Sequence, residues 1–167
     1  MELFAPGRQA EILESFLQKR IEALRLNITS KKATRRFGPV NASGRLANSL
    51  RLEVAPDTGA IYAVGYARFV EQGRGPGKPP PVAVLIEWAL AKRIIPKAGG
   101  TLRGFAFAVQ NKIRREGTDI FKEGGRSGVL SDAINAAALT TLRQELAVSV
   151  AQQATSFLLP TSPPATD

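Results

Sequence analysis

A regular apolar stripe near the start of the chain places the strongest restriction on the fold. Apolar side chains recur there at three- and four-residue steps, which is the spacing of one face of an amphipathic helix. The side chains concerned are Ile12, Leu13, Phe16, Leu17, Ile21 and Leu24. We therefore predict a helix over residues 8–26 whose apolar face is covered by other elements. With 167 residues, the chain has room for one core of ordinary size and not for two.

Residues 50–66 supply a candidate partner for that face. Apolar and charged residues alternate over 50–54, which is the period-two pattern of a half-buried strand. Turn-forming residues follow, and a second, apolar strand is predicted over 60–66. Because one hairpin is marginal alone, we expect a further strand beside it. We also expect it to pack against the 8–26 helix and a helix at 82–94.

Helical spacing returns in the second half of the chain. A helix is predicted over 81–94, with proline in its first turn, and another over 102–116, which Gly117 ends. A long helix then starts near residue 131 and extends toward residue 157. Together these elements define an α+β fold, in which a small antiparallel sheet packs against several helices and a long helix ends the chain.

The segments between these elements are predicted as loops of a single α+β domain at 1–159. Residues 27–42 are basic and lack periodicity, which indicates a mobile loop that an acidic surface or DNA would order. Ser43 is expected to cap a short helical turn after this loop. The Gly/Pro loop at 72–81 excludes regular structure, and the tail at 160–167 is predicted to be flexible.

Two absences remove most enzymatic chemistry. The chain contains no cysteine and no histidine, which excludes thiolate catalysis, cysteine-ligated metal sites, the Ser-His-Asp triad and the usual general base. The segment Gly73–Lys78 resembles a phosphate-binding loop. However, Gln72 and Pro79 stand where such a loop has glycine and Ser or Thr. We therefore predict a protein that is not an enzyme and that uses no cofactor.

The charge of the chain is large and unevenly distributed. The net charge is +9, and Lys/Arg against Asp/Glu number ten to six in residues 1–60, twelve to five in 61–127 and one to three in 128–167. A basic body predicts an acidic partner surface, which is either a nucleic acid or a protein.

Neither a signal peptide nor a membrane-spanning run is recognisable, so no membrane contact is expected.

Residues predicted to contact partners gather in two places. Four cations lie in the basic loop, and the others lie between the hairpin and the end of the Gly/Pro loop, where recognition residues are often exposed. The full set is Lys31, Lys32, Arg35, Arg36, Tyr66, Arg68, Glu71, Arg74, Lys78, Pro79, Pro80 and Pro81. Two other interpretations stay open: a solvated charge run in the basic loop, and a weak surface ion pair between Glu71 and Arg74. Trp88, Phe105 and Phe107 are interpreted as core residues.

Short motifs occur in a distinctive order. After the predicted leading helix, Ser43–Leu50 reads SGRLANSL, and Tyr62–Gly73 reads YAVGYARFVEQG before a proline-bearing loop. This order resembles that of the tail-completion or neck proteins of tailed bacteriophages. In that family, an S/T-G-x-L-x-x-S-L-like turn comes first, and a strand whose end carries the sequence valine-glutamate-x-glycine follows. The resemblance covers roughly residues 8–94. The three consecutive prolines, the 104–116 helix and the long last helix depart from the shorter members.

The resemblance implies a structural virion protein that forms a homo-oligomeric ring in the neck or the head-proximal tail end. Such a ring completes the tail and joins it to the head. The resemblance also implies assembly in the host cytoplasm and contacts with further copies, with neighbouring neck or tail proteins, and with DNA passing through the ring. The alternative is a small basic protein that binds DNA non-specifically through phosphate contacts.

Overall fold

The fold is described from a computed structural model, which describes residues 6–30, 32–34, 38–55, 58–97 and 99–158. Helices dominate, and the strands form two small antiparallel pairs, β1–β2 and β3–β4. The predicted α+β class and the long last helix are therefore confirmed. The elements in order are α1 (Pro6–Ser30), β1 (Lys32–Thr34), β2 (Gly38–Pro39), α2 (Arg45–Asn48), β3 (Arg51–Ala55), β4 (Thr58–Tyr62), α3 (Ala67–Gln72), α4 (Val82–Ala91), α5 (Leu102–Glu116), α6 (Asp119–Lys122) and α7 (Ala136–Leu158).

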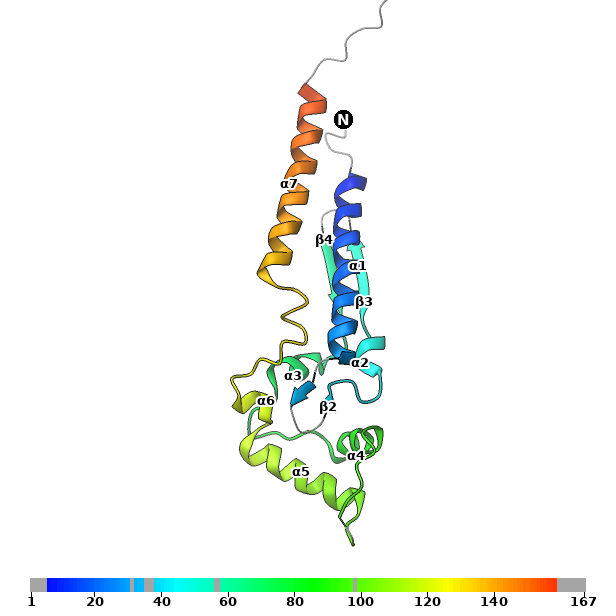
Figure 1. The fold of residues 1–167 in the computed structure, drawn as a ribbon, viewed down its shortest axis with the longest axis vertical. Coiled ribbons are helices and arrows are strands. Elements are labelled where there is room, and N and C mark those ends of the chain that lie inside the picture. Colours follow the sequence, from blue (N-terminus) through cyan, green and yellow to red (C-terminus); the bar gives the residue numbers. More distant parts are fainter. Residues whose placement is uncertain (1–5, 31, 35–37, 56–57, 98, 159–167) are drawn as a thin grey trace, which may run out of the picture.

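The helix α1 is the element around which the others pack. It contacts the β3–β4 hairpin, α2, β2 and α7, and α7 runs antiparallel to it along the long axis of the molecule (Figure 1). Its buried face carries Ile21, Leu24 and Ile28, whose exposed fractions are at most 4%. The helix extends four residues beyond the predicted end because Ile28 continues the apolar stripe into the core.

The β3–β4 hairpin covers one part of α1. Residues pair from Arg51 with Tyr62 to Ala55 with Thr58, and the exposed and half-buried side chains of β3 alternate as its sequence predicts. Gly59 lies so close to the Leu17 side chain that a Cβ atom would collide with it. Two details of the prediction are wrong. β4 ends at Tyr62 instead of residue 66, and among the described residues no third strand joins the pair.

A helical lobe formed by α3, α4, α5 and α6 lies at one end of the molecule (Figure 1). The prediction that the helix at 82–94 packs on the hairpin is wrong, since α4 packs against α5 instead. The Trp88 and Phe105 rings stack across this contact, with centroids 6.5 Å apart. Phe107, predicted to be in the core, is 42% exposed. It projects from the opposite side of α5 because it lies two residues from Phe105.

The basic loop predicted at 27–42 is partly regular structure. Residues 27–30 form the last turn of α1, and β1 pairs with β2. Asn41 then returns to α1, since its amide donates to the Ile28 carbonyl oxygen at 3.1 Å. The predicted Ser43 cap is also wrong: Gly44 occupies the cap position of α2, and its amide donates to Asn41 Oδ1 at 2.9 Å. Asn41 thus binds the amide of the cap residue, and no side chain caps α2 in place of Ser43.

A carboxylate in α3 fixes the segment that leads into α7. Glu71 accepts hydrogen bonds from Ser131 Oγ and the Leu130 amide, both at 2.7 Å, and from Ser127 Oγ at 3.1 Å and the Gly128 amide at 3.3 Å. These bonds hold residues 127–131 in turns. The long helix therefore starts at Ala136 and not at the predicted residue 131.

The turn held by Glu71 also completes the core under α1. Val129 is fully buried, and its carbonyl oxygen accepts from Asn27 Nδ2 at 3.1 Å. Ala133 is 2% exposed, and its carbonyl oxygen accepts from an Arg20 guanidinium nitrogen at 3.2 Å. Side chains from α1 and α3 therefore hold this segment from two sides.

Replacing Glu71 by glutamine is expected to lower the free energy of unfolding by about 1 to 3 kcal/mol, because four partly buried donors lose a charged acceptor. Burial opposes ionisation of Glu71, but the hydrogen bonds from Ser131, Leu130 and Ser127 outweigh it and hold its pKa below the ordinary value of 4.5. The carboxylate therefore stabilises the fold fully above pH 4.5, and this contribution is lost as pH falls through the lowered pKa.

Denaturant unfolding of both forms at neutral and at acidic pH tests this prediction. The difference between wild type and Glu71→Gln should shrink in acid. The matched control is Glu53→Gln on the exposed face of β3, which should stay within about 0.5 kcal/mol of wild type. Equal stability of wild type and Glu71→Gln at neutral pH contradicts the anchoring role.

Candidate functional site

The Gly/Pro loop lies in the lobe and is hydrogen-bonded to α5 and α6. Residues 73–81 form neither helix nor strand, as predicted, whereas Gln72, predicted as the first loop residue, ends α3. The Thr118 amide donates to the Arg74 carbonyl oxygen at 2.8 Å, and the Arg74 amide donates to Thr118 Oγ1 at 2.8 Å. Further along, Gln110 Nε2 donates to the Pro80 carbonyl oxygen at 2.9 Å. The loop is therefore a fixed part of the lobe surface.

Glycine is required where this loop crosses α6. Gly73 and Gly117 adopt φ near +75° with ψ at −174°, a combination almost confined to glycine. A Cβ atom on Gly73 would lie 2.5 Å from the Phe121 amide nitrogen, and one on Gly117 would lie 2.8 Å from the Arg74 carbonyl oxygen. The loop glycines thus allow two backbone segments to touch.

Two predicted contact residues flank one aromatic ring. The Arg68 and Arg74 guanidinium carbons lie 4.6 Å and 4.0 Å from the centre of the Phe69 ring. Arg74 also donates to the Lys78 carbonyl oxygen at 3.1 Å. Arg68 is exposed, whereas Arg74 is half-buried by these contacts. The ion pair considered between Glu71 and Arg74 does not form, because Glu71 accepts from the 127–131 turn instead.

The remaining predicted contact residues are dispersed. Lys78 and Pro81 are exposed, and Pro79 and Pro80 are half-buried at the lobe surface. Of the basic-loop residues, Lys32 lies in β1. Lys31, Arg35 and Arg36 lie outside the described residues. Tyr66 directly precedes α3 and lines a pocket, and it is 37% exposed.

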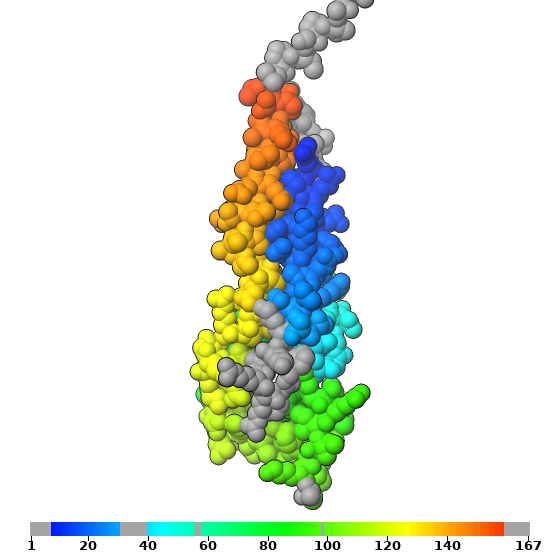
Figure 2. Space-filling model, viewed as in Figure 1, coloured from blue at the N-terminus to red at the C-terminus, as the bar shows by residue number. Residues whose placement is uncertain are grey.

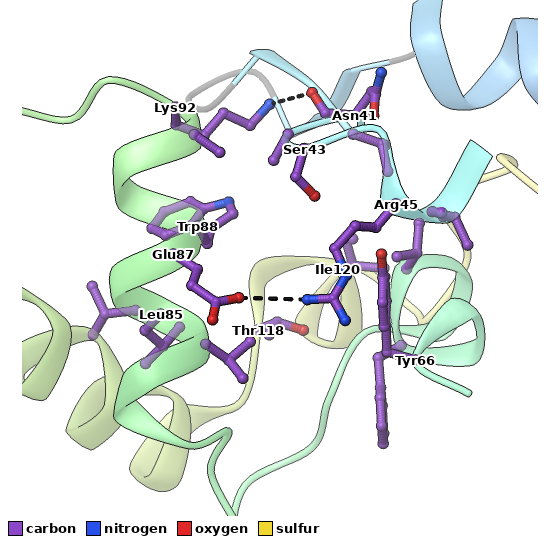
Figure 3. Close-up of a pocket in the computed structure, with 18 of the residues that line it drawn as sticks. Asn41, Ser43, Arg45, Tyr66, Leu85, Glu87, Trp88, Lys92, Thr118 and Ile120 are labelled. Carbon is purple, nitrogen blue, oxygen red and sulfur yellow. Dashed lines mark hydrogen bonds and ion pairs between the residues drawn. The ribbon is translucent and has the colours of Figure 1, made fainter. Parts of the chain in front are cut away.

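This pocket is a concave, mostly apolar feature of the lobe. Its volume is about 500 Å³, and it lies between residues 40–46, α3, α4, α5 and the start of α6 (Figure 3). Its walls are mostly apolar. They include Phe69, Val84, Leu85, Trp88, Val109, Ile113 and Ile120. A volume of this size accommodates a drug-sized ligand or a pair of large side chains. We call it the lobe pocket.

Polar groups lie around the lobe pocket. Arg45 and Glu87 form an ion pair across it at 3.5 Å, and Lys92 Nζ donates to the Asn41 carbonyl oxygen at 3.2 Å (Figure 3). Both partners of the ion pair are about two-thirds exposed, so the pair contributes little stability. Burial lowers the pKa of Lys92. Burial also raises the pKa of Tyr66, and the charge on Arg45 acts against that shift.

The second surface feature is the uncovered part of α7. Figure 2 shows α7 lying along α1, with its last turns at the end of the molecule opposite the lobe. Of its 23 residues, only Ser149 is buried. Its large exposed apolar side chains are Leu139, Val148, Val150, Phe157 and Leu158. An apolar helix with so little covered surface is typical of a protein-binding element.

The sequence predicts that the long last helix contacts neighbouring subunits, but it revealed neither the lobe pocket nor which part of α7 is uncovered. The lobe pocket joins residues far apart in the chain, and Trp88 was assigned to the core. The one available signal was that residues 82–91 are apolar on nearly all sides, whereas a surface helix is apolar on one stripe only. The uncovered part of α7 was hidden because helical spacing does not show which face a neighbour covers.

Over the described ranges, no group of three or more carboxylates is placed to hold a metal ion. Nor is any helix in that part of the chain long and apolar enough to span a membrane. Comparison with protein-family models, with curated proteins and with solved structures gives no significant match. The site is therefore described by its own geometry: an apolar pocket at one pole and an uncovered helix at the other.

Replacing Gly73 by alanine is expected to lower the free energy of unfolding by more than about 2 kcal/mol, because the backbone conformation disfavours a side chain and the added carbon meets Phe121. Gly65→Ala is the matched control, since a Cβ atom there meets nothing within 4 Å. It should be neutral or slightly stabilising. Denaturant midpoints decide the outcome, and equal midpoints for the two variants contradict the described crossing.

Proposed function

We propose that this protein is a ring-forming structural subunit of a tailed-phage virion. In this proposal it acts in the neck or the head-proximal tail end, completes the tail and joins it to the head. Its partners are further copies of itself and neighbouring neck or tail proteins. It is assembled in the host cytoplasm and ends in the virion. It works by binding and not by catalysis.

The observation that carries the proposal is the uncovered α7. A helix of 23 residues with a single buried residue is stabilised little by its own chain, since most helical stability in proteins comes from tertiary packing. Its exposed apolar side chains favour a protein partner over solvent. A subunit that completes its packing only on assembly meets this requirement.

The motif order supports the phage assignment more than any single residue does. The SGRLANSL segment forms the turn of α2, directly before the hairpin. The valine-glutamate-x-glycine segment forms α3 and not a strand end, because Glu71 has to face the 127–131 turn. In this chain the valine-glutamate-x-glycine segment therefore also stabilises the fold, through the hydrogen bonds of Glu71 to the 127–131 turn.

A second candidate function is non-specific DNA binding, and α5 favours it. Its exposed cations are Arg103, Lys112, Arg114 and Arg115, and the Arg103 guanidinium carbon lies 5.8 Å from the centre of the exposed Phe107 ring. Such a surface can contact phosphates, either in a free DNA-binding protein or inside a ring through which DNA passes.

Charge reversal at Arg68 tests the assembly proposal. Arg68→Glu is expected to change the free energy of unfolding by about 1 kcal/mol or less, since Arg68 is exposed and its main contact is the Phe69 ring. Phage that carries Arg68→Glu should nevertheless accumulate heads and tails that are not joined, counted by electron microscopy. Arg74 is unsuitable for this test because it is half-buried. Arg51→Glu on the exposed face of β3 is the control. Normal joined virions from the Arg68→Glu variant, or from phage lacking the protein, contradict the assignment.

A salt titration separates the two candidates. If DNA binding is the function, the affinity for duplex DNA should fall with salt at a log–log slope of about −0.9 per phosphate neutralised. The double variant Arg114→Ala, Arg115→Ala should then reduce that slope. For an assembly subunit, self-association through apolar surfaces should change little over the same salt range. A steep slope without self-association favours the alternative.

A further inference from the structure

The end of α7 presents two large apolar side chains to solvent. Phe157 is 65% exposed and Leu158 is 78% exposed, and they follow each other in the last turn of the helix. Val150, two turns earlier, is 41% exposed. Exposed apolar side chains at the end of a helix are typical of residues that insert into a partner's pocket. We call Phe157 and Leu158 the anchor, and no other described part of the same chain covers them.

The lobe pocket has the complementary properties. It is apolar, it has a volume of about 500 Å³, and it opens beside the exposed Val84 and Ala91 of α4. Pockets of roughly 300 to 1,000 Å³ enclose drug-sized ligands, and a Phe-Leu pair is of that size. The pocket thus has the size and the chemistry to receive the anchor.

The anchor of a chain is too far from the lobe pocket of the same chain. An irregular segment leads from the lobe to the first turn of α7, and α7 then runs away from the lobe along α1 (Figure 1). Phe157 lies 21 residues after Ala136, which at about 1.5 Å per residue places it about 32 Å from the start of the helix. A second copy has to supply the occupant of the pocket.

Charge supports the same pairing. The lobe belongs to residues 61–127, where twelve Lys/Arg stand against five Asp/Glu. The pocket lining itself holds three cations, Arg45, Lys92 and Lys112, against two carboxylates, Glu87 and Asp119. From residue 144 onward, the only charged side chains are Glu145 and Asp167, and both are acidic. Docking the C-terminal end of one copy on the lobe of another therefore brings together segments of opposite sign.

We infer that Phe157 and Leu158 of one copy insert into the lobe pocket of the next copy. The two surfaces are different, so the contact is heterologous, and repetition of one heterologous contact closes a ring when the rotation between copies permits it. The inference rests on the self-association in the proposed function and adds the residues that make the contact.

A cysteine cross-link tests the contact directly, because the chain has no cysteine of its own. Ser156→Cys in one preparation and Ala91→Cys in another are mixed and oxidised, which leaves Phe157 and Leu158 in place. Both positions are exposed in the free chain, and Ala91 lines the lobe pocket, so neither change should disturb folding. The expected result is a disulfide-linked heterodimer whose joined peptides contain residues 91 and 156, identified by mass spectrometry. Leu26→Cys, 65% exposed on α1, replaces Ser156→Cys in the control and should give no such product.

A second measurement uses the anchor itself. The double variant Phe157→Ser, Leu158→Ser should raise the dissociation constant for self-association at least about tenfold, since one large buried apolar side chain has an effect of that size. Leu26→Ser should leave it unchanged. If rings assemble but neither the cross-link nor the serine effect is found, another surface or partner occupies the pocket. The inference is then overturned while the proposed function stands. If wild type does not self-associate at all, both fail.

Discussion

The four hydrogen bonds to Glu71 are the interaction on which the rest of the architecture depends. They hold residues 127–131 in turns, place Val129 in the core beneath α1 and set the point from which α7 departs. The helical lobe and the α1–hairpin part meet at this point. A carboxylate stabilises such a crossing well because it accepts several backbone and hydroxyl donors at once.

Local signals in the sequence were sufficient for parts of the fold. The helix at 102–116 begins after a Thr101 side chain that accepts from the Gly104 amide and ends at Gly117, so both bounds matched the prediction. The alternating pattern of β3 was equally local. The role of Glu71, by contrast, depends on donors 56 to 60 residues away, and no spacing rule reaches that far. For the same reason the late start of α7 and the lobe pocket could not be predicted, although the motif order still suggested an assembly protein.

The molecule carries its main apolar surfaces at opposite poles, with a weak helix contact between them. Within the packing of α7 on α1, Ser149 Oγ and the side-chain amide of Gln153 are buried without a hydrogen-bond partner among the described residues. Burying each such group without a hydrogen-bond partner costs about 1 to 3 kcal/mol of folding free energy. The position of α7 is thus held less firmly by its own chain than the lobe is, and a neighbouring copy that covers Val148 or Phe157 would add the missing stabilisation. In the proposed assembly, the docking of a neighbouring copy would be coupled to the final ordering of α7.

Imaging the purified full chain by electron microscopy tests the central claim, that this protein is a self-assembling ring subunit, most directly. The expected images are closed rings of one diameter with a central opening, in which the end of α7 of each subunit reaches the lobe of its neighbour. Two outcomes contradict the claim: a uniform population of single elongated subunits at high protein concentration, and assembly that occurs only when DNA is added.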